Sequence, residues 1–153
     1  MKPSFSEVQR KYPKTESREA LFTEIGWTGL IDNNSYWDTC AIRMSYALRL
    51  ARVPFVSGNM RAKAGKIKGQ LIQIRQGDLS RALKTLWGAP EIYRGERAAR
   101  DGIGARKGLV SFFRISGGNG GHIDLVEPGP NGFLACERSC YFSAVMVWFW
   151  ELP

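Results

Sequence analysis

The chain has 153 residues, of which 44% are hydrophobic and 12% aromatic, and its 22 Lys and Arg against 14 Asp and Glu give a formal net charge of +8. These values predict one globular domain over residues 1–153 with a hydrophobic core, and they exclude a disordered chain or a multidomain protein. No apolar run approaches the roughly 18 residues of a membrane span, and the N-terminus lacks the apolar stretch of a secretory signal.

Helices are expected to dominate the first half of the chain. The first 35 residues are interrupted by proline and glycines, which predicts two short helices followed by a loop. Asp38 and Thr39 then form a typical N-cap sequence, and the apolar spacing that follows predicts a helix over residues 40–52 with one buried face. A second amphipathic helix is expected between Asp78 and Gly88.

Basic residues are concentrated in the middle of the chain. Nine Lys and Arg lie between Arg49 and Lys84, with Asp78 as the only acid, whereas acids outnumber bases from Gly120 onward. This predicts a basic patch beside a more acidic sheet. Two explanations of such a patch are equally good. It is either an ordinary solvated surface, or it binds an anionic partner such as nucleic acid, a lipid surface or a cell-wall polymer. We expect a weak strand over residues 70–76 and a mobile loop with one helical turn over residues 94–108.

The last third of the chain has the pattern of β-strands separated by turns. The strands are expected over residues 109–115, 121–127, 132–137 and 145–152. Helices first and an antiparallel meander after them predict an α+β domain. The final strand is almost entirely apolar, so we expect it to be buried on both faces, with Trp148 and Trp150 in the core rather than on a ligand platform.

Cys40 and His122 are the residues with the clearest chemical potential. Cys40 stands at the predicted first turn of a helix, where free N–H groups and the helix dipole are expected to favour the thiolate. His122, the only histidine, follows a glycine-rich loop that lets a substrate approach closely. A cysteine at a helix start and a histidine on a later strand match the order of papain-like catalysis. Metal binding is not expected, because paired Cys-x-x-Cys or His-x-x-x-His spacings are missing.

A catalytic triad also needs a group that orients His122. If residues 128–131 form a four-residue hairpin loop, counting back along both strands places His122 opposite Glu137, with Cβ atoms ~5 Å apart. Asp124 lies on the same face as His122 and is the other candidate, although ~6–7 Å of strand rise separates the two. We prefer Glu137, and a one-residue slip or a bulge would reverse this order.

Cys136 and Cys140 are four residues apart and form either a small-loop disulfide or two unrelated thiols. A disulfide indicates an oxidising compartment, yet no signal peptide directs the chain there. The two observations together fit a protein made in the cytoplasm and delivered across an envelope by a dedicated machine.

Three ordered motifs resemble one known family. Residues 39–48 read TCAIRMSYAL and resemble the nucleophile helix of the type VI secretion amidase effectors of family four; residues 121–125 read GHIDL and resemble their histidine strand. Cys136 and Cys140, followed by VWFWELP at residues 147–153, resemble their C-terminal cysteine pair, here the expected disulfide, and their closing strand. The opening Pro-Ser-Phe also fits, so the resemblance covers most of the chain.

The resemblance implies an antibacterial toxin with a papain-like, NlpC-type fold, in which the nucleophile helix packs on the C-terminal meander. Such enzymes cleave the amide between D-glutamate and meso-diaminopimelate in peptidoglycan stem peptides of a target cell's periplasm, and an immunity protein protects the producer. By analogy Cys40 attacks the carbonyl, His122 is base and then acid, and backbone N–H groups near Cys40 hold the oxyanion. Trp37, Asp38 and Gly121 are candidates for substrate binding. No cofactor is needed.

One departure from the family pattern concerns the third catalytic residue. The family has an aspartate near the cysteine pair, whereas Glu137, Arg138 and Ser139 stand between the cysteines here. Either Glu137 or Asp124 takes that role. The competing interpretations of the chain are a basic nucleic-acid-binding module or nuclease toxin that uses His122, and a non-catalytic cell-wall-binding domain. Neither is preferred, because the sequence has no recognisable nucleic-acid-binding motif and basic charge alone is weak support.

Overall fold

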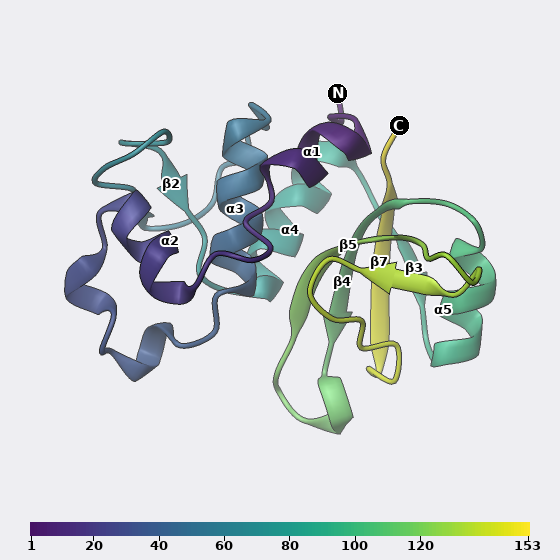
Figure 1. The fold of residues 1–153 in the computed structure, drawn as a ribbon. Helices are drawn as coiled ribbons and strands as arrows, with labels where there is room; N and C mark the ends of the chain where they lie inside the picture. Colours follow the sequence, from purple (N-terminus) through teal and green to yellow (C-terminus); the bar gives the residue numbers. More distant parts are fainter.

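The computed structural model describes residues 1–153, in which a helical half packs beside an antiparallel sheet (Figure 1). The helices are α1 (Phe5–Lys11), α2 (Arg18–Ile25), α3 (Cys40–Leu50), α4 (Gln76–Trp87) and α5 (Glu96–Ile103), with 3-10 turns at Thr28–Leu30, Asn34–Tyr36 and Ile115–Gly117. The strands are β1 (Met60–Arg61), β2 (Leu71–Ile72), β3 (Glu91–Tyr93), β4 (Gly108–Phe113), β5 (His122–Pro128), β6 (Leu134–Cys136) and β7 (Met146–Glu151). The predicted α+β class is confirmed.

The main sheet has the strand order β3-β7-β4-β5-β6 and is antiparallel at every pairing. Strands β4, β5 and β6 follow one another as the expected meander, whereas β7 returns to the other side of β4. Because β7 lies between two strands, its apolar run is buried, as predicted. Trp148 and Trp150 both belong to the core cluster that the sheet shares with α1, α3 and α4.

Helix α3 is the central helix of the fold. It begins at Cys40, as predicted, and packs against α1, α4 and strand β5. The sequence suggested one buried face, but Cys40 to Leu48 are all buried, because two hydrophobic clusters lie on different sides of the helix. Arg43 is buried among them and donates to the carbonyls of Pro13 and Glu16, both at 2.7 Å. The nucleophile candidate therefore starts a helix that is fixed from all sides.

Two segments differ from the expectations. Residues 94–108 contain a full helix, α5, between Gly95 and Gly104, whose Ala99 and Ile103 are buried beside the sheet. The weak strand expected over residues 70–76 is limited to Leu71–Ile72, because α4 already begins at Gln76.

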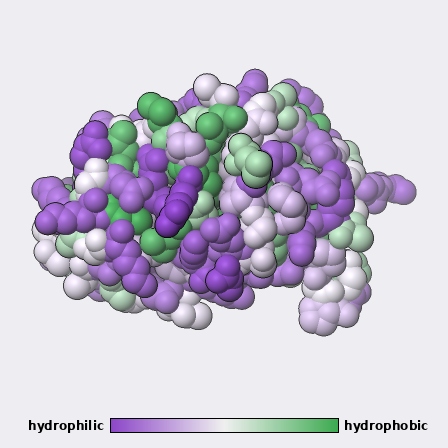
Figure 2. Space-filling model, turned by 90° about the horizontal axis from the view of Figure 1, so that it is seen from above, coloured by the Kyte–Doolittle hydropathy of each residue, from purple (hydrophilic) through white to green (hydrophobic).

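None of the helices combines the length and hydropathy that crossing a membrane requires. The face that carries both termini is largely hydrophilic, with apolar areas mainly over the helical half (Figure 2).

Candidate active site

Cys40 is only 6% exposed at the start of α3. Its backbone N–H donates to Asp38 Oδ1 at 3.0 Å, so the carboxylate of Asp38 caps the helix, whereas the side chain of the N-cap residue Thr39 makes no capping bond and accepts from Arg43 instead. Burial raises the pKa of the Cys40 thiol, and the charge of Asp38 raises it further. Backbone N–H donors lower this pKa, but their effect is smaller. The N–H groups at the helix start lower the pKa as predicted, but burial and Asp38 outweigh them, so the thiol needs a base to react.

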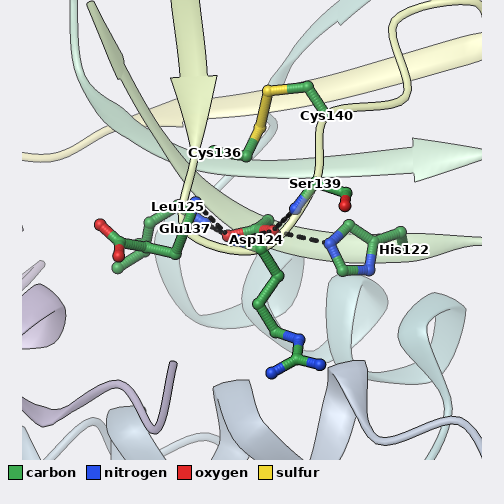
Figure 3. The surroundings of a disulfide bond; sticks show 8 residues. His122, Asp124, Leu125, Cys136, Glu137, Ser139 and Cys140 are labelled. Atoms are coloured by element: carbon green, nitrogen blue, oxygen red, sulfur yellow. Dashed lines mark hydrogen bonds and ion pairs between the residues drawn. A yellow bond between two sulfur atoms is a disulfide. The ribbon is translucent and has the colours of Figure 1, made fainter. Parts of the chain in front are cut away.

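His122 is the first residue of β5 and its side chain is 12% exposed. Its Nε2 lies 2.7 Å from Asp124 Oδ2, which leaves Nδ1 without a partner (Figure 3). The ring stacks parallel to Phe112, its pairing partner on β4, and Tyr141 meets it edge-on at 5.2 Å between centroids. These contacts fix the orientation of the imidazole.

Asp124 is completely buried and is surrounded by hydrogen-bond donors. Besides His122, its carboxylate accepts the backbone N–H groups of Leu125, Glu137, Arg138 and Ser139 at 2.7 to 3.1 Å. Both oxygens of this buried charge are thus satisfied, as a carboxylate removed from water requires. The loop that follows β6 closes over Asp124 and locks its position.

Glu137 does not lie opposite His122, so the predicted hairpin register is wrong. Val126 pairs with Cys136 and Pro128 with Leu134, which makes the connection one residue longer than assumed and ends the ladder before Glu137. The side chain of Glu137 instead accepts from Gln9 at 2.7 Å and lies 3.4 Å from the ammonium of Lys14. The alternative, Asp124, holds the contact with His122.

Cys136 and Cys140 form the expected disulfide, with an S–S distance of 1.99 Å (Figure 3). The bond closes residues 137–139 into a tight loop, and these are the residues whose N–H groups bind Asp124. The disulfide and the His122–Asp124 pair are therefore parts of one assembly.

Cys40 and His122 line the same cavity of about 580 Å³, here called the central cavity. The predicted substrate-binding residues Trp37, Asp38 and Gly121 also line it, and Trp37 is 73% exposed. Sequence reasoning missed three lining residues next to or within the disulfide loop, namely Arg138, Ser139 and Tyr141. Their proximity to the cysteine pair was the available signal, but it did not reveal that the loop folds back onto β5.

The central cavity has the chemical groups that acyl transfer requires. A buried thiol and an imidazole with one free nitrogen line it, and a buried carboxylate behind the imidazole contacts its other nitrogen; a nucleophile, a base and a group that orients the base need these residue types. No cluster of three or more His, Cys, Asp or Glu side chains is arranged to hold a metal ion.

The fold is similar to that of known effector proteins. The type VI effector Tae4 from Enterobacter cloacae superposes with a TM-score of 0.79 and 21% identity, over 100% of this chain and 98% of that chain. The effector–immunity complexes Tae4–Tai4 from Enterobacter cloacae and from Salmonella Typhimurium give TM-scores of 0.77 and 0.75 at 20% and 21% identity, with complete coverage of both chains. At such identities these likenesses establish the fold.

Family membership comes from a separate comparison. No curated protein matches the sequence. The family described as "Type VI secretion system (T6SS), amidase effector protein 4" matches residues 36–150, a range that contains Cys40, His122, Asp124 and both disulfide cysteines. Because this match spans most of the sequence, the chain belongs to the Tae4 family of type VI secretion amidase effectors.

Proposed function

We propose that the chain is a peptidoglycan amidase that hydrolyses the D-glutamate–meso-diaminopimelate amide of stem peptides. Cys40 is the nucleophile, His122 the general base and Asp124 the residue that positions His122. The observation that carries this proposal is the 2.7 Å pair of His122 Nε2 and the buried Asp124 Oδ2, because His122 lines the same cavity as Cys40. Membership of an amidase family supports the bond type.

The proposed mechanism begins with the thiol, because burial keeps Cys40 protonated at rest. Nδ1 of His122 takes the proton, and Asp124 stabilises the imidazolium through Nε2. The thiolate attacks the amide carbon, His122 protonates the leaving amine, and a thioester remains on Cys40. Water, deprotonated by His122, then cleaves the thioester and releases the free carboxylate.

Asp124 also explains the departure from the family pattern. The segment between the two cysteines has no aspartate side chain, but its backbone N–H groups hold the carboxylate that comes from β5. The main chain of the loop thus helps to hold the carboxylate that orients His122. This arrangement needs Asp124 and does not need the carboxylate of Glu137, which contacts Gln9 and Lys14.

We further propose that one catalytic domain spans residues 1–153 and is delivered by the type VI apparatus to act in the periplasm of a target cell. The Cys136–Cys140 disulfide supports action in an oxidising compartment. Solved relatives are effector–immunity complexes, and we infer that a cognate immunity protein binds this chain too.

The test is mass spectrometry of purified muropeptides after incubation with the wild-type protein and with Cys40→Ala. We expect the wild type to release fragments cut between D-glutamate and diaminopimelate, and the variant to lose more than about 10³-fold in rate, because no other group can form the thioester. Circular dichroism of both proteins controls for folding. Full activity of a folded Cys40→Ala variant would contradict the proposal.

A further inference from the structure

A second pocket, of about 430 Å³ and here called the distal pocket, lies in the helical half of the molecule. One wall comes from the end of α2 and the 3-10 turn Thr28–Leu30, and the other comes from β1 and the residues on both sides of it. In Figure 1, α2 and β2, the pairing partner of β1, lie on the side of α3 away from the main sheet. The distal pocket shares no lining residue with the central cavity, so a ligand bound there leaves access to Cys40 free.

The distal pocket combines an apolar floor with a positively charged rim. Trp27 is buried and Leu30 and Met60 are half-buried, so these side chains form the floor. Arg61 and Lys63 are exposed at the rim, and none of the lining residues is an acid. The volume is within the range of ~300–1,000 Å³ that is common for small-ligand sites. This composition favours a ligand that carries an anionic group next to a small apolar one.

The two cations at the rim are free to bind an anion. Arg61 donates one N–H of Nη1 to the carbonyl of Gly69 at 2.7 Å, which orients the guanidinium and leaves most of its N–H groups available. The ammonium of Lys63 makes no hydrogen bond, and neither cation forms an ion pair. A carboxylate that reaches both cations gains charge-assisted hydrogen bonds without having to displace an acid of the protein.

The backbone that carries both cations is fixed against the end of α2. Gly26 ends this helix with a φ of +77°, and a Cβ at this position would lie only 2.9 Å from the Cβ of Lys63. The N–H of Lys63 donates to the carbonyl of Ile25 at 2.8 Å, and the indole N–H of Trp27 donates to the carbonyl of Arg61 at 3.0 Å. The distal pocket is therefore formed before a ligand arrives, which lowers the entropic cost of binding.

The charge of the distal pocket selects among anions. A free amino acid carries an ammonium beside its carboxylate, and the two cations would repel this ammonium. Single-stranded nucleic acid is bound along grooves that track its backbone, whereas here two cations stand over a small apolar floor. A peptide that ends in alanine fits better, because its last residue has a free carboxylate, a methyl group and no ammonium.

We propose that the distal pocket binds the C-terminal alanine of a peptidoglycan stem peptide, with its carboxylate on Arg61 and Lys63 and its methyl group on the apolar floor. This inference rests on the proposed function, which makes peptidoglycan the substrate. Because the two sites share no residue, the bound peptide is a neighbour of the one that Cys40 cleaves. Attachment at a second point raises the effective concentration of the wall at the catalytic site.

The test uses N-acetyl-D-Ala-D-Ala and its C-terminal carboxamide, which have the same size and differ in the charge of the last group. Heteronuclear NMR follows binding through the indole N–H of Trp27, which lies at the pocket and is bonded to Arg61. We expect the acid to shift the Trp27 signal and to bind about tenfold more tightly than the carboxamide. Equal affinities of the two peptides, or an unchanged Trp27 signal, contradict the proposal.

Two lysine variants test whether the rim of the distal pocket is responsible. Lys63→Gln is expected to weaken binding of N-acetyl-D-Ala-D-Ala about tenfold. Lys68→Gln removes the same charge from the same loop but outside the distal pocket, so it is the matched control and is expected to bind as the wild type does. Equal losses in both variants would show a general effect of charge and overturn the assignment. A Trp27 shift with a short oligonucleotide but not with the peptide would overturn it in favour of nucleic acid.

Failure of this inference is distinguishable from failure of the proposed function. N-acetyl-D-Ala-D-Ala contains no bond between D-glutamate and diaminopimelate, so its binding does not depend on amide cleavage. A wild-type protein that cleaves muropeptides but does not bind this peptide contradicts the distal-pocket assignment alone. A protein that binds the peptide at Trp27 but leaves muropeptides intact contradicts the proposed function instead.

Discussion

At the scale of single residues, substitutions of the two candidate carboxylates are expected to affect catalysis differently. Asp124 contacts Nε2 of His122, whereas Glu137 contacts Gln9 and Lys14. We expect Asp124→Asn to lower kcat by roughly 10²–10⁴-fold with little change in KM, because the imidazole loses the acceptor that holds it. Glu137→Gln is expected to stay within a few fold of the wild type. Steady-state kinetics on one muropeptide distinguish the two, and the reverse ranking would restore Glu137.

The charge of Asp38 gives a prediction for the pH dependence of Cys40. Burial is the first cause that raises the pKa of the thiol, and Asp38 is the next. Asp38→Asn therefore lowers this pKa, so at any pH below it the thiolate fraction and the alkylation rate increase, by a factor of about ten if the pKa falls by one. Iodoacetamide labelling from about pH 6 to 10 measures this, and an unchanged profile contradicts it. Denatured protein provides the reference profile.

The sequence identified some of these residues and could not identify others. Cys40 and His122 are found because their residue types and their places at a helix start and a strand start are local features. The choice between Asp124 and Glu137 depended on the register of a hairpin, and Val126 pairs with Cys136, three positions beyond its expected partner, which moves Glu137 away from His122. The register of a hairpin depends on tertiary contacts, and the composition of a Pro- and Gly-rich turn does not determine it.

At the scale of elements, the loop closed by the disulfide supports the catalytic strand. Residues 137–139 present three N–H groups to Asp124, and the Cys136–Cys140 bond restricts them. For the Cys136→Ser, Cys140→Ser variant we expect a loss of about 2 kcal/mol in unfolding free energy and at least about a tenfold loss in kcat. Urea unfolding and muropeptide kinetics measure the two effects. Unchanged kcat in a destabilised protein would show that the loop holds Asp124 without the bond.

The longer the apolar pattern of a helix or strand, the more closely the sequence predicts its bounds. Helix α3 and strands β4, β5 and β7 have long apolar patterns and were placed to within about two residues. Helix α5 was missed because only Ala99 and Ile103 face the core among arginines and glycines. The position of β7 beside β4 is a matter of topology, which strand patterns alone do not encode.

At the scale of the whole molecule, the basic middle segment does not act as one patch. Arg49 is a structural residue, since it donates to the carbonyl of Leu71 and lies 3.6 Å from the ring centre of Phe55. Lys63 and Lys68 are exposed, form no ion pairs and lie outside the central cavity. The exposed lysines are thus available to attract an anionic surface without touching the reacting bond.

This separation predicts different salt responses for large and small substrates. Because screening weakens attraction to a polymer of many charges more than binding of one small peptide, cleavage of intact peptidoglycan sacculi is expected to fall several-fold between about 50 and 300 mM NaCl, with little change for soluble muropeptides. Lys63→Gln with Lys68→Gln is expected to weaken sacculus cleavage and its salt dependence and to leave muropeptide cleavage unchanged. Arg94→Gln with Arg97→Gln removes equal charge near α5 as control. Equal losses for both double variants would mean that net charge, rather than these lysines, brings the enzyme to the wall.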